Sequence, residues 1–392
     1  MAPPKARILA CALVHAEPHL FDAHLAQIKA QKLPRGVEVH LAHIIDAEGE
    51  LKTALEEVCK KHGSEILPTL MPHPKEAEYA VGPVSHHWTQ PTFDWLALHK
   101  QSLIEAAQRE HYTHIWFVDS DLLLEPTTLA SLLSIRREAV SAVFWTTWNA
   151  TNSGSLGPNV WLSHPYGMQG LGIDAQKFLK SLTDRKLNRV LGGGACFLLS
   201  LDALQETQIR YHPRLPDLPQ GGMWQGEDRS FAVLCQRFHV EQYADPWPDI
   251  WHCYHPQMRT PEFIETALAT INFPRQEKAN IGDLVNFTIE ALEEPRLINI
   301  DSPSRKPKAF VRAVRGRLGQ LNLLPEIEIA LARLKVGAEA IINVSFPGWY
   351  EISEYAGQTK SFRIALIDVK SFGHAPVLAD HLFQGVTDDK IA

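Results

Sequence analysis

The sequence lacks the features that define several common classes of protein. It has five cysteines in 392 residues, and none forms a C-x-x-C pair. An odd, scattered set is untypical of disulfide frameworks and zinc ribbons, so we expect a reducing, cytoplasmic setting. No apolar stretch approaches the roughly 20 residues of a membrane span. The net charge of -7 disfavours nucleic acid as the main partner, although a local basic patch would be compatible with it.

The amino terminus has the outline of a signal peptide, but its apolar run is short. Lys5 and Arg7 precede the apolar residues 8–14, and Glu17 follows soon after. We therefore interpret residues 8–14 as a first buried strand. With 45% hydrophobic and 21% charged residues, the composition is that of a globular protein long enough for two or three domains.

The first half of the chain alternates apolar strands with helical patterns. We predict strands at residues 8–14 and 37–45 and helices at residues 20–31, 51–62 and 94–110, which is a βαβ arrangement of the α/β class. Asp46 follows the second strand, where a carboxylate could accept hydrogen bonds from a ribose or base; the alternative is a solvated loop residue. Lys100 lies in the third helix, and it either contacts a phosphate or sits on a solvated helix face.

The central stretch is HIWFVDSDLLLEP, residues 114–126. Its apolar run ends in two acids, Asp119 and Asp121, which point the same way because side chains alternate along a strand. Open α/β sheets bind ligands at the carboxyl ends of their strands. Two carboxylates at that edge suit Mg²⁺ or Mn²⁺, and a bound cation can hold a diphosphate. The alternative is a pair of capping acids before a helix at residues 127–135.

A run of three glycines, residues 192–194, precedes a predicted strand at residues 195–199. Gly193 and Gly194 would leave the backbone exposed, so that a ligand could approach it closely. The surrounding sequence is not that of a phosphate-binding P-loop, and a flexible turn is the alternative. Upstream, we predict one strand over residues 139–147 and a loop over residues 148–170.

Two further stretches carry chemically useful side chains. Glu227 and Asp228 follow Gly226 at the start of a predicted helix, whose dipole favours ionised acids, and a general base must be ionised. The alternative is an ordinary helix cap. His252 and His255 lie in the stretch DPWPDIWHCYHP. An imidazole beside carboxylates would favour Mn²⁺ over Mg²⁺, whereas most lone histidines are structural.

Taken together, residues 1 to about 270 resemble a GT-A-fold glycosyltransferase in the order and spacing of these motifs. The resemblance implies that Asp121 binds a metal ion and that Asp119 contacts the ribose or the metal. It also implies that His252, rather than His255, completes the coordination. Asp228 would then be the base in an inverting enzyme, whereas in retaining members this region only positions the acceptor.

The composition changes after residue 275, where we predict two strands, a helix and two more strands. Residues 281–371 resemble an FKBP-type prolyl isomerase domain of the trigger-factor variety. The stretches that carry this resemblance are IGDLVNFTIEALEE, LLPEIEIALARLKVGAEAIINVSFPGWY and SFRIALIDVK. An aliphatic residue replaces the aromatic that lines the floor of the family's proline pocket. We therefore expect peptide binding rather than isomerase turnover. The remaining candidate pocket aromatics are Phe287, Phe346, Trp349 and Tyr350, and a purely structural domain is the alternative.

The sequence thus predicts an α/β GT-A domain, residues 1–274, followed by a smaller α+β FKBP-like domain, residues 281–392. The predicted function is metal-dependent transfer of a sugar from a nucleotide-sugar donor to an acceptor hydroxyl, with a protein as one candidate acceptor. A saccharide, lipid or modified nucleic acid as acceptor is one alternative, and a non-catalytic, chaperone-like peptide binder is another. The candidate donor-binding residues are Asp46, Lys100, Asp119, Gly193 and Gly194, the candidate metal ligands are Asp119, Asp121, His252 and His255, and the candidate catalytic acids are Glu227 and Asp228.

Overall fold

The structure is a computed structural model. It describes residues 6–71, 74, 89–147, 156–161, 173–205, 207–213, 215, 226–254, 256–271, 283–292, 311–317, 325–345 and 359–370. These residues divide into two compact units. The N-terminal unit comprises the described residues up to 132 and from 137 to 271, and the C-terminal unit comprises residues 133–136 and those from 283 to 370.

The N-terminal unit is built on one eight-stranded mixed sheet, in the order β10-β13-β6-β12-β4-β1-β2-β3. The strands β1, β2, β3 and β4 run parallel to one another, β12 is antiparallel to both β4 and β6, and β13 is parallel to β6. The bounds are Ala6–Val14 for β1, Val37–Ile45 for β2, Glu65–Ile66 for β3, His114–Val118 for β4, Ala139–Ala142 for β6, Asn188–Val190 for β10, Cys196–Ser200 for β12 and Gln242–Asp245 for β13. The predicted α/β class is confirmed.

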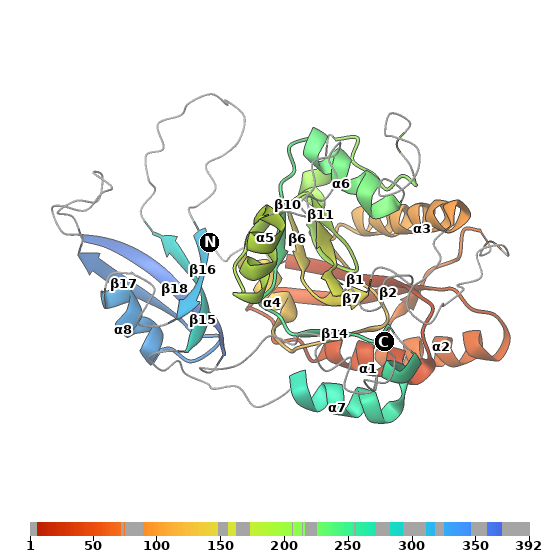
Figure 1. Ribbon diagram of the computed structural model, residues 1–392, viewed down its shortest axis with the longest axis horizontal. Coiled ribbons are helices and arrows are strands. Elements are labelled where there is room, and N and C mark those ends of the chain that lie inside the picture. Colours follow the sequence, from red (N-terminus) through yellow and green to blue (C-terminus); the bar gives the residue numbers. More distant parts are fainter. Residues whose placement is uncertain are drawn as a thin grey trace. The chain divides into compact units, whose positions relative to one another are not determined.

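Helices cover both faces of this sheet (Figure 1). On one face α3 and α6 pack against β1, β4 and β12, and Phe117, Phe197 and Phe231 lie in the shared core. The helices α1 and α2 cover the other face. The bounds are Pro18–Lys29 for α1, Gly49–His62 for α2, Gln90–Arg109 for α3, Thr128–Ser134 for α4, Ile173–Thr183 for α5, Glu227–Arg237 for α6 and Pro261–Ile271 for α7, with short 3-10 helices at Leu201–Leu204 and Pro256–Arg259.

Three short strand pairs complete the N-terminal unit. They join β5 (Leu122–Leu124) with β14 (Ile250–His252), β7 (Trp145–Thr147) with β8 (Leu156–Pro158), and β9 (Val160–Trp161) with β11 (Gly192–Gly193). The prediction of one strand over residues 139–147 was wrong, because the chain leaves the large sheet after Ala142. Asn159 instead pairs with the backbone of Phe144. The Asn159 Oδ1 accepts from Phe144 N at 2.9 Å, and the Asn159 backbone N–H donates to Phe144 O at 3.1 Å.

In its described residues, the C-terminal unit is a four-stranded antiparallel sheet with one helix, and these elements follow the predicted order. These elements are β15 (Leu284–Ala291), β16 (Val311–Arg317), α8 (Pro325–Arg333), β17 (Glu339–Ser345) and β18 (Thr359–Lys370), with the sheet order β16-β15-β18-β17. Phe287, a candidate pocket aromatic, is 0% exposed and belongs to the hydrophobic core with Ile327 and Leu366. The other three candidates, Phe346, Trp349 and Tyr350, lie outside the described residues.

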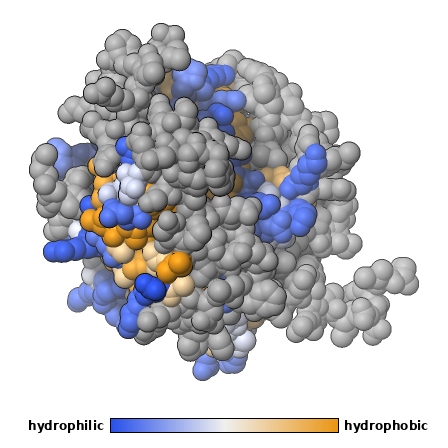
Figure 2. Space-filling view, turned by 90° about the vertical axis from the view of Figure 1, so that its left-hand side faces the viewer, coloured by the Kyte–Doolittle hydropathy of each residue, from blue (hydrophilic) through white to orange (hydrophobic). Residues whose placement is uncertain are grey.

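Some large apolar side chains are exposed at the surface. Figure 2, which draws one face of the molecule, shows a patch of hydrophobic residues with hydrophilic residues beside it. In the described part of the C-terminal unit, Leu292, Ile329 and Ile341 are 38%, 51% and 64% exposed. All five cysteines are buried free thiols. Within the described ranges, no helix combines the length and hydrophobicity needed to cross a bilayer.

Candidate active site

The acid pair lies where β4 ends. After Val118 the chain turns, and the turn is fixed by backbone bonds from Asp119 N to Ala195 O at 2.7 Å and from Leu122 N to Asp119 O at 3.1 Å. Asp119 is partly buried, and burial raises its pKa to about 7; the Lys100 charge opposes this shift, and the Asp121 and Asp228 carboxylates add to it. Negative charge is therefore crowded at this edge of the sheet, and a cation bound here would relieve it.

Asp121 faces His252 across the β5–β14 pair. His252 is in register with Leu122, and Cys253 N donates to Asp121 O at 2.9 Å. These backbone bonds bring His252 Nε2 to 3.3 Å from Asp121 Oδ2, with the two side chains only 12% and 19% exposed. The other ring nitrogen, Nδ1, lies 3.0 Å from Thr146 Oγ1. When Nδ1–H donates to Thr146, Nε2 keeps the lone pair that a metal ligand requires.

These residues fit a metal ion only if a further ligand joins them. In the described part of the chain, no group of three or more His, Cys, Asp or Glu side chains is arranged to hold a metal ion by itself. Mg²⁺ is commonly bound by one or two carboxylates together with the phosphates of a substrate rather than by an all-protein cage. Asp121 fits that pattern, with a diphosphate and water as further ligands, and the His252 imidazole would suit Mn²⁺ better than Mg²⁺.

A buried lysine joins the second acid pair to α3. Lys100 Nζ lies 2.8 Å from Glu227 Oε1 and 2.7 Å from Asp228 Oδ1. Burial would lower the pKa of Lys100, but the Asp228 and Glu227 carboxylates raise it well above its usual value. Burial raises the pKa of Glu227 against the opposing effect of Lys100. The prediction that Lys100 sits on a solvated helix face was wrong, since Lys100 is 8% exposed.

The start of α6 determines where the two acids lie. Gly226 precedes the helix with φ +119, a conformation that other residues rarely adopt. Glu227 and Asp228 then occupy the first turn, as predicted from the sequence. Their exposures differ, because the Glu227 side chain is 6% exposed and the Asp228 side chain is 27% exposed. Asp228 is therefore the acid that a substrate can reach from solvent.

The three glycines are packed against protein atoms rather than exposed to a ligand. All three are buried, and Gly192 and Gly193 form the strand β11. A Cβ at Gly193 would lie 2.6 Å from Ser141 Oγ, and a Cβ at Gly194 would overlap the Asp228 carboxylate. The expectation of an open backbone was wrong. The absence of a side chain at Gly194 instead makes room for Asp228.

Asp46 lies at the same edge of the sheet, at the end of β2. Its backbone N donates to Val14 O at 2.9 Å, and its side chain is 3.6 Å from His15 Nδ1. The hydrogen bond with the Asp46 side chain raises the pKa of His15, against the effect of partial burial. The buried Asp46 is therefore not the solvated loop residue of the alternative prediction. The remaining candidate, His255, lies outside the described residues.

The structure brings most of the candidates together and adds partners that the sequence did not indicate. Asp119 links the two groups electrostatically, since the charges of Asp121 and His252 and those of Lys100 and Asp228 all act on its pKa. Thr146 and Asn159 support this site from β7 and from the residue before β9; the Asn159 amide donates to Gly194 O at 2.9 Å. Each partner is more than 30 residues distant in sequence, so no local pattern could have identified it.

A buried polar network also supports the strand that carries His252. Asp249 N donates to Glu125 Oε2 at 2.9 Å, and Arg185 Nη2 lies 2.7 Å from Asp249 Oδ1. Arg185 Nη1 donates to Trp247 O at 2.6 Å. These bonds fix the residues before β14 against the residue after β5, and so hold the backbones of Asp121 and His252 together. In the sequence, the only signal of this network is one acid in each of two apolar stretches, Glu125 in the first and Asp249 in the second.

Comparison with known proteins gives partial likenesses. No protein-family model matches the sequence. A trigger factor from Polynucleobacter necessarius subsp. necessarius (strain STIR1) is 40% identical over 73 residues, which is 18% of this chain and 16% of the trigger factor. The chain thus spans a small part of that relative's length.

Similar solved structures include glycosyltransferases. The likeness to S. aureus TarS 1-349 has 10% identity and a TM-score of 0.34, over 61% of this chain and 57% of that one. For the mannosyltransferase PcManGT from Pyrobaculum calidifontis, in complex with GDP-Man and Mn²⁺, the identity is 12% and the TM-score 0.32, over 60% and 52%. The likeness to glucosyl-3-phosphoglycerate synthase from Mycobacterium tuberculosis, in complex with Mn²⁺, UDP-Glc and phosphoglyceric acid, has 12% identity and a TM-score of 0.32. It covers 71% of this chain and 82% of that one. The chain covers just over half of the first two.

Proposed function

We propose that this chain is a metal-dependent glycosyltransferase that uses a nucleoside diphosphate-sugar donor. The observation that carries the proposal is the presence of two charged groups that both act on Asp119: the Asp121–His252 carboxylate–imidazole pair, and the acid pair bonded to Lys100. Sugar transfer from a diphosphate needs both parts, one to hold the charge of the leaving group and one to take the proton of the acceptor.

The Asp121–His252 pair supports the donor side of the proposal. Asp121 Oδ2 and His252 Nε2 would hold a divalent cation, with Asp119 beside them. Such a cation, when bound, neutralises the charge of the diphosphate. An imidazole in the ligand set favours Mn²⁺, although Mg²⁺ remains an alternative. Asp46, at the end of β2, is the candidate partner for the ribose or base.

The Asp228 carboxylate supports the acceptor side. In an inverting reaction, the acceptor hydroxyl transfers its proton to a carboxylate oxygen of Asp228 as the hydroxyl oxygen bonds to the anomeric carbon of the sugar. The bond from that carbon to the diphosphate oxygen breaks, and the nucleoside diphosphate leaves with the electron pair. In a retaining reaction Asp228 would only position the acceptor, and the anomer of the product distinguishes the two cases.

A panel of nucleoside diphosphate-sugars tests the proposed function. Each donor is incubated with the protein and Mn²⁺, and release of the nucleoside diphosphate is followed. The proposal predicts slow hydrolysis of at least one donor, which stops when EDTA removes the metal and in the Asp228→Asn or Asp121→Ala variant. If the folded protein hydrolyses none of the donors and transfers from none, with either Mn²⁺ or Mg²⁺, the chain is not such an enzyme.

For the C-terminal unit we propose recognition of a polypeptide acceptor. Its support is the exposed apolar side chains Ile329 and Ile341, together with the sequence resemblance to a peptide-binding domain. Holding the acceptor near the site would raise its effective concentration. A truncation ending near Pro274 should then raise the KM for a protein acceptor and leave transfer to a small acceptor unchanged. Equal KM values would make the unit structural.

A further inference from the structure

Neither donor binding nor the role of Asp228 as a base explains the position of Lys100 by itself. It lies on α3, is 8% exposed, and bonds to both acids at the start of α6. Two of its three ammonium hydrogens therefore point at Glu227 and Asp228. The ammonium also lies 5.4 Å from the centre of the Tyr211 ring, within cation–π range. Its hydrogen-bonding capacity is thus directed mainly at the acid pair, which leaves little of it for a phosphate.

The surroundings of Lys100 make its charge necessary. Two carboxylates side by side repel each other, and the repulsion is larger where one of them, as here Glu227, is buried. One ammonium between them offsets that repulsion and fixes both oxygens at hydrogen-bond distance. Glu227 lies deeper than Asp228, so the pair is asymmetric: one acid serves as a buried counter-charge and the other reaches the surface.

Resting on the proposed function, we infer that Lys100 is a positioning residue for the acceptor side of the transfer reaction: its ammonium holds the Asp228 carboxylate in place for the acceptor, and Glu227 is the buried second partner of that ammonium. On the other side Gly194 leaves the space that the Asp228 carboxylate fills. The Asp228 side chain is thus confined between an ammonium and a bare backbone. This confinement orients the carboxylate before any substrate arrives.

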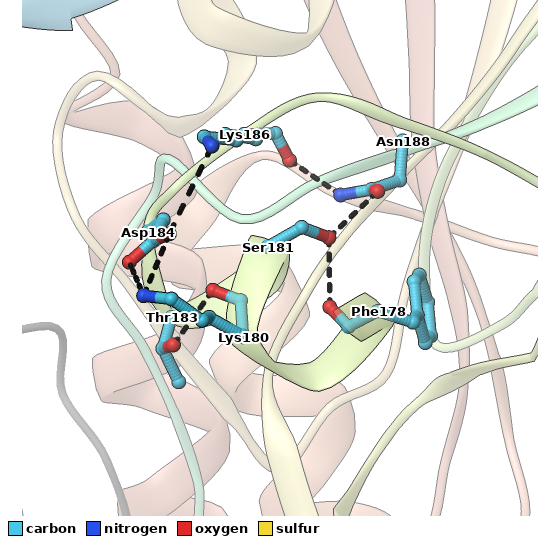
Figure 3. A network of polar contacts seen from close by, with 7 residues as sticks. All are labelled: Phe178, Lys180, Ser181, Thr183, Asp184, Lys186 and Asn188. Carbon is cyan, nitrogen blue, oxygen red and sulfur yellow. Dashed lines mark hydrogen bonds and ion pairs between the residues drawn. The ribbon is translucent and has the colours of Figure 1, made fainter. Parts of the chain in front are cut away.

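The inference is tested with Lys100→Met and Lys100→Arg in the full chain. A matched control is Lys180→Met, because Lys180 pairs with Asp184 at 3.1 Å on the exposed surface of α5 (Figure 3). For each variant we would measure nucleoside diphosphate affinity in the presence of Mn²⁺, kcat for transfer, KM for the acceptor, and the thermal unfolding midpoint. Since Lys100→Met leaves two acids unpaired, Lys100→Met with Glu227→Gln provides a second variant if the single one does not fold.

Lys100→Met should lower kcat by about 10²-fold, the usual effect of a misplaced catalytic group, with nucleotide affinity unchanged. Lys100→Arg should recover most of kcat, because a guanidinium can also donate hydrogen bonds to both carboxylates. Lys180→Met should match wild type in all four measurements.

Two results would overturn the inference without touching the proposed function. Weaker nucleotide binding in Lys100→Met, with kcat unchanged, would make Lys100 a phosphate ligand. Unchanged kcat and nucleotide affinity in a folded variant would make Lys100 purely structural. A wild-type protein that neither binds nor hydrolyses a nucleotide sugar would instead overturn the proposed function, and that result is separate because it appears before any variant is made.

Discussion

His252 Nε2 lies 3.3 Å from Asp121 Oδ2, although the two residues come from stretches far apart in the sequence. The β5–β14 pair sets this distance, and Thr146 sets the orientation of the imidazole. The fold itself therefore brings this carboxylate and this imidazole together.

The first prediction concerns the support of the imidazole. Outer hydrogen bonds to a metal-binding histidine are typically worth about 10- to 100-fold in metal affinity. Thr146→Val should therefore weaken Mn²⁺ binding by about that factor, and His252→Ala should weaken it more. A Mn²⁺ titration in the presence of a nucleoside diphosphate measures both, with the exposed His40→Ala as control. His255→Ala should have a smaller effect than His252→Ala; the reverse order would transfer the ligand role to His255.

The second prediction concerns the base. Asp228→Asn keeps the shape of the side chain but cannot accept the proton, so transfer should fall by about 10²- to 10⁴-fold, with donor affinity retained. Glu227→Gln should lower transfer less, because Glu227 is buried beneath the site. Steady-state transfer assays compare the two. Equal rates for Asp228→Asn and wild type would remove Asp228 from the chemistry.

The third prediction uses the close approach of Gly194 to Asp228. A Cβ at Gly194 would overlap the Asp228 carboxylate, so Gly194→Ala should displace that side chain and lower kcat, with nucleotide affinity kept. The control is Gly63→Ala, at the C-cap of α2 with φ +69 and nothing within 4 Å, which should cost about 1 kcal/mol of stability without changing kcat. Wild-type kcat in Gly194→Ala would mean that Asp228 need not occupy that space.

The sequence predicted those parts of the molecule that local patterns determine. The strand at residues 37–45 and the placement of both acids in the first turn of α6 agree with the structure, because apolar runs and a glycine before a helix are local signals. The contacts of Lys100 were not predictable, since its partners are 127 and 128 residues away. The glycine run shows a further limit: composition indicated an open backbone, whereas packing against Ser141 and Asp228 fills that space.

The fourth prediction concerns stability and pH. Burial lowers the pKa of His43 from 6.5 to about 3, with a smaller contribution from His24. Below pH 6.5 the unfolded chain binds a proton at this residue and the folded protein does not, so the free energy of unfolding should fall by up to about 1.4 kcal/mol per pH unit. This loss of stability should be absent above pH 6.5 and complete near pH 3.

This pH effect can be isolated by comparing variants. Urea unfolding at pH 7.5 and 5.0, followed by the fluorescence of buried Trp95 and Trp116, should show a smaller pH-dependent loss for His43→Leu than for wild type. The exposed His40→Leu should behave as wild type does. The same loss in His43→Leu would mean that His43 is protonated in the folded protein or that its charge is compensated there.

The most direct test of the account is a calorimetric titration of the protein with nucleoside diphosphate-sugars, with Mn²⁺ or with EDTA. We predict that at least one sugar nucleotide binds when Mn²⁺ is present and that EDTA abolishes this binding. The Asp121→Ala variant should not bind the sugar nucleotide, although its thermal unfolding midpoint should stay at the wild-type value. Absence of binding by the folded wild type, or binding that is indifferent to both Mn²⁺ and Asp121, would contradict the account.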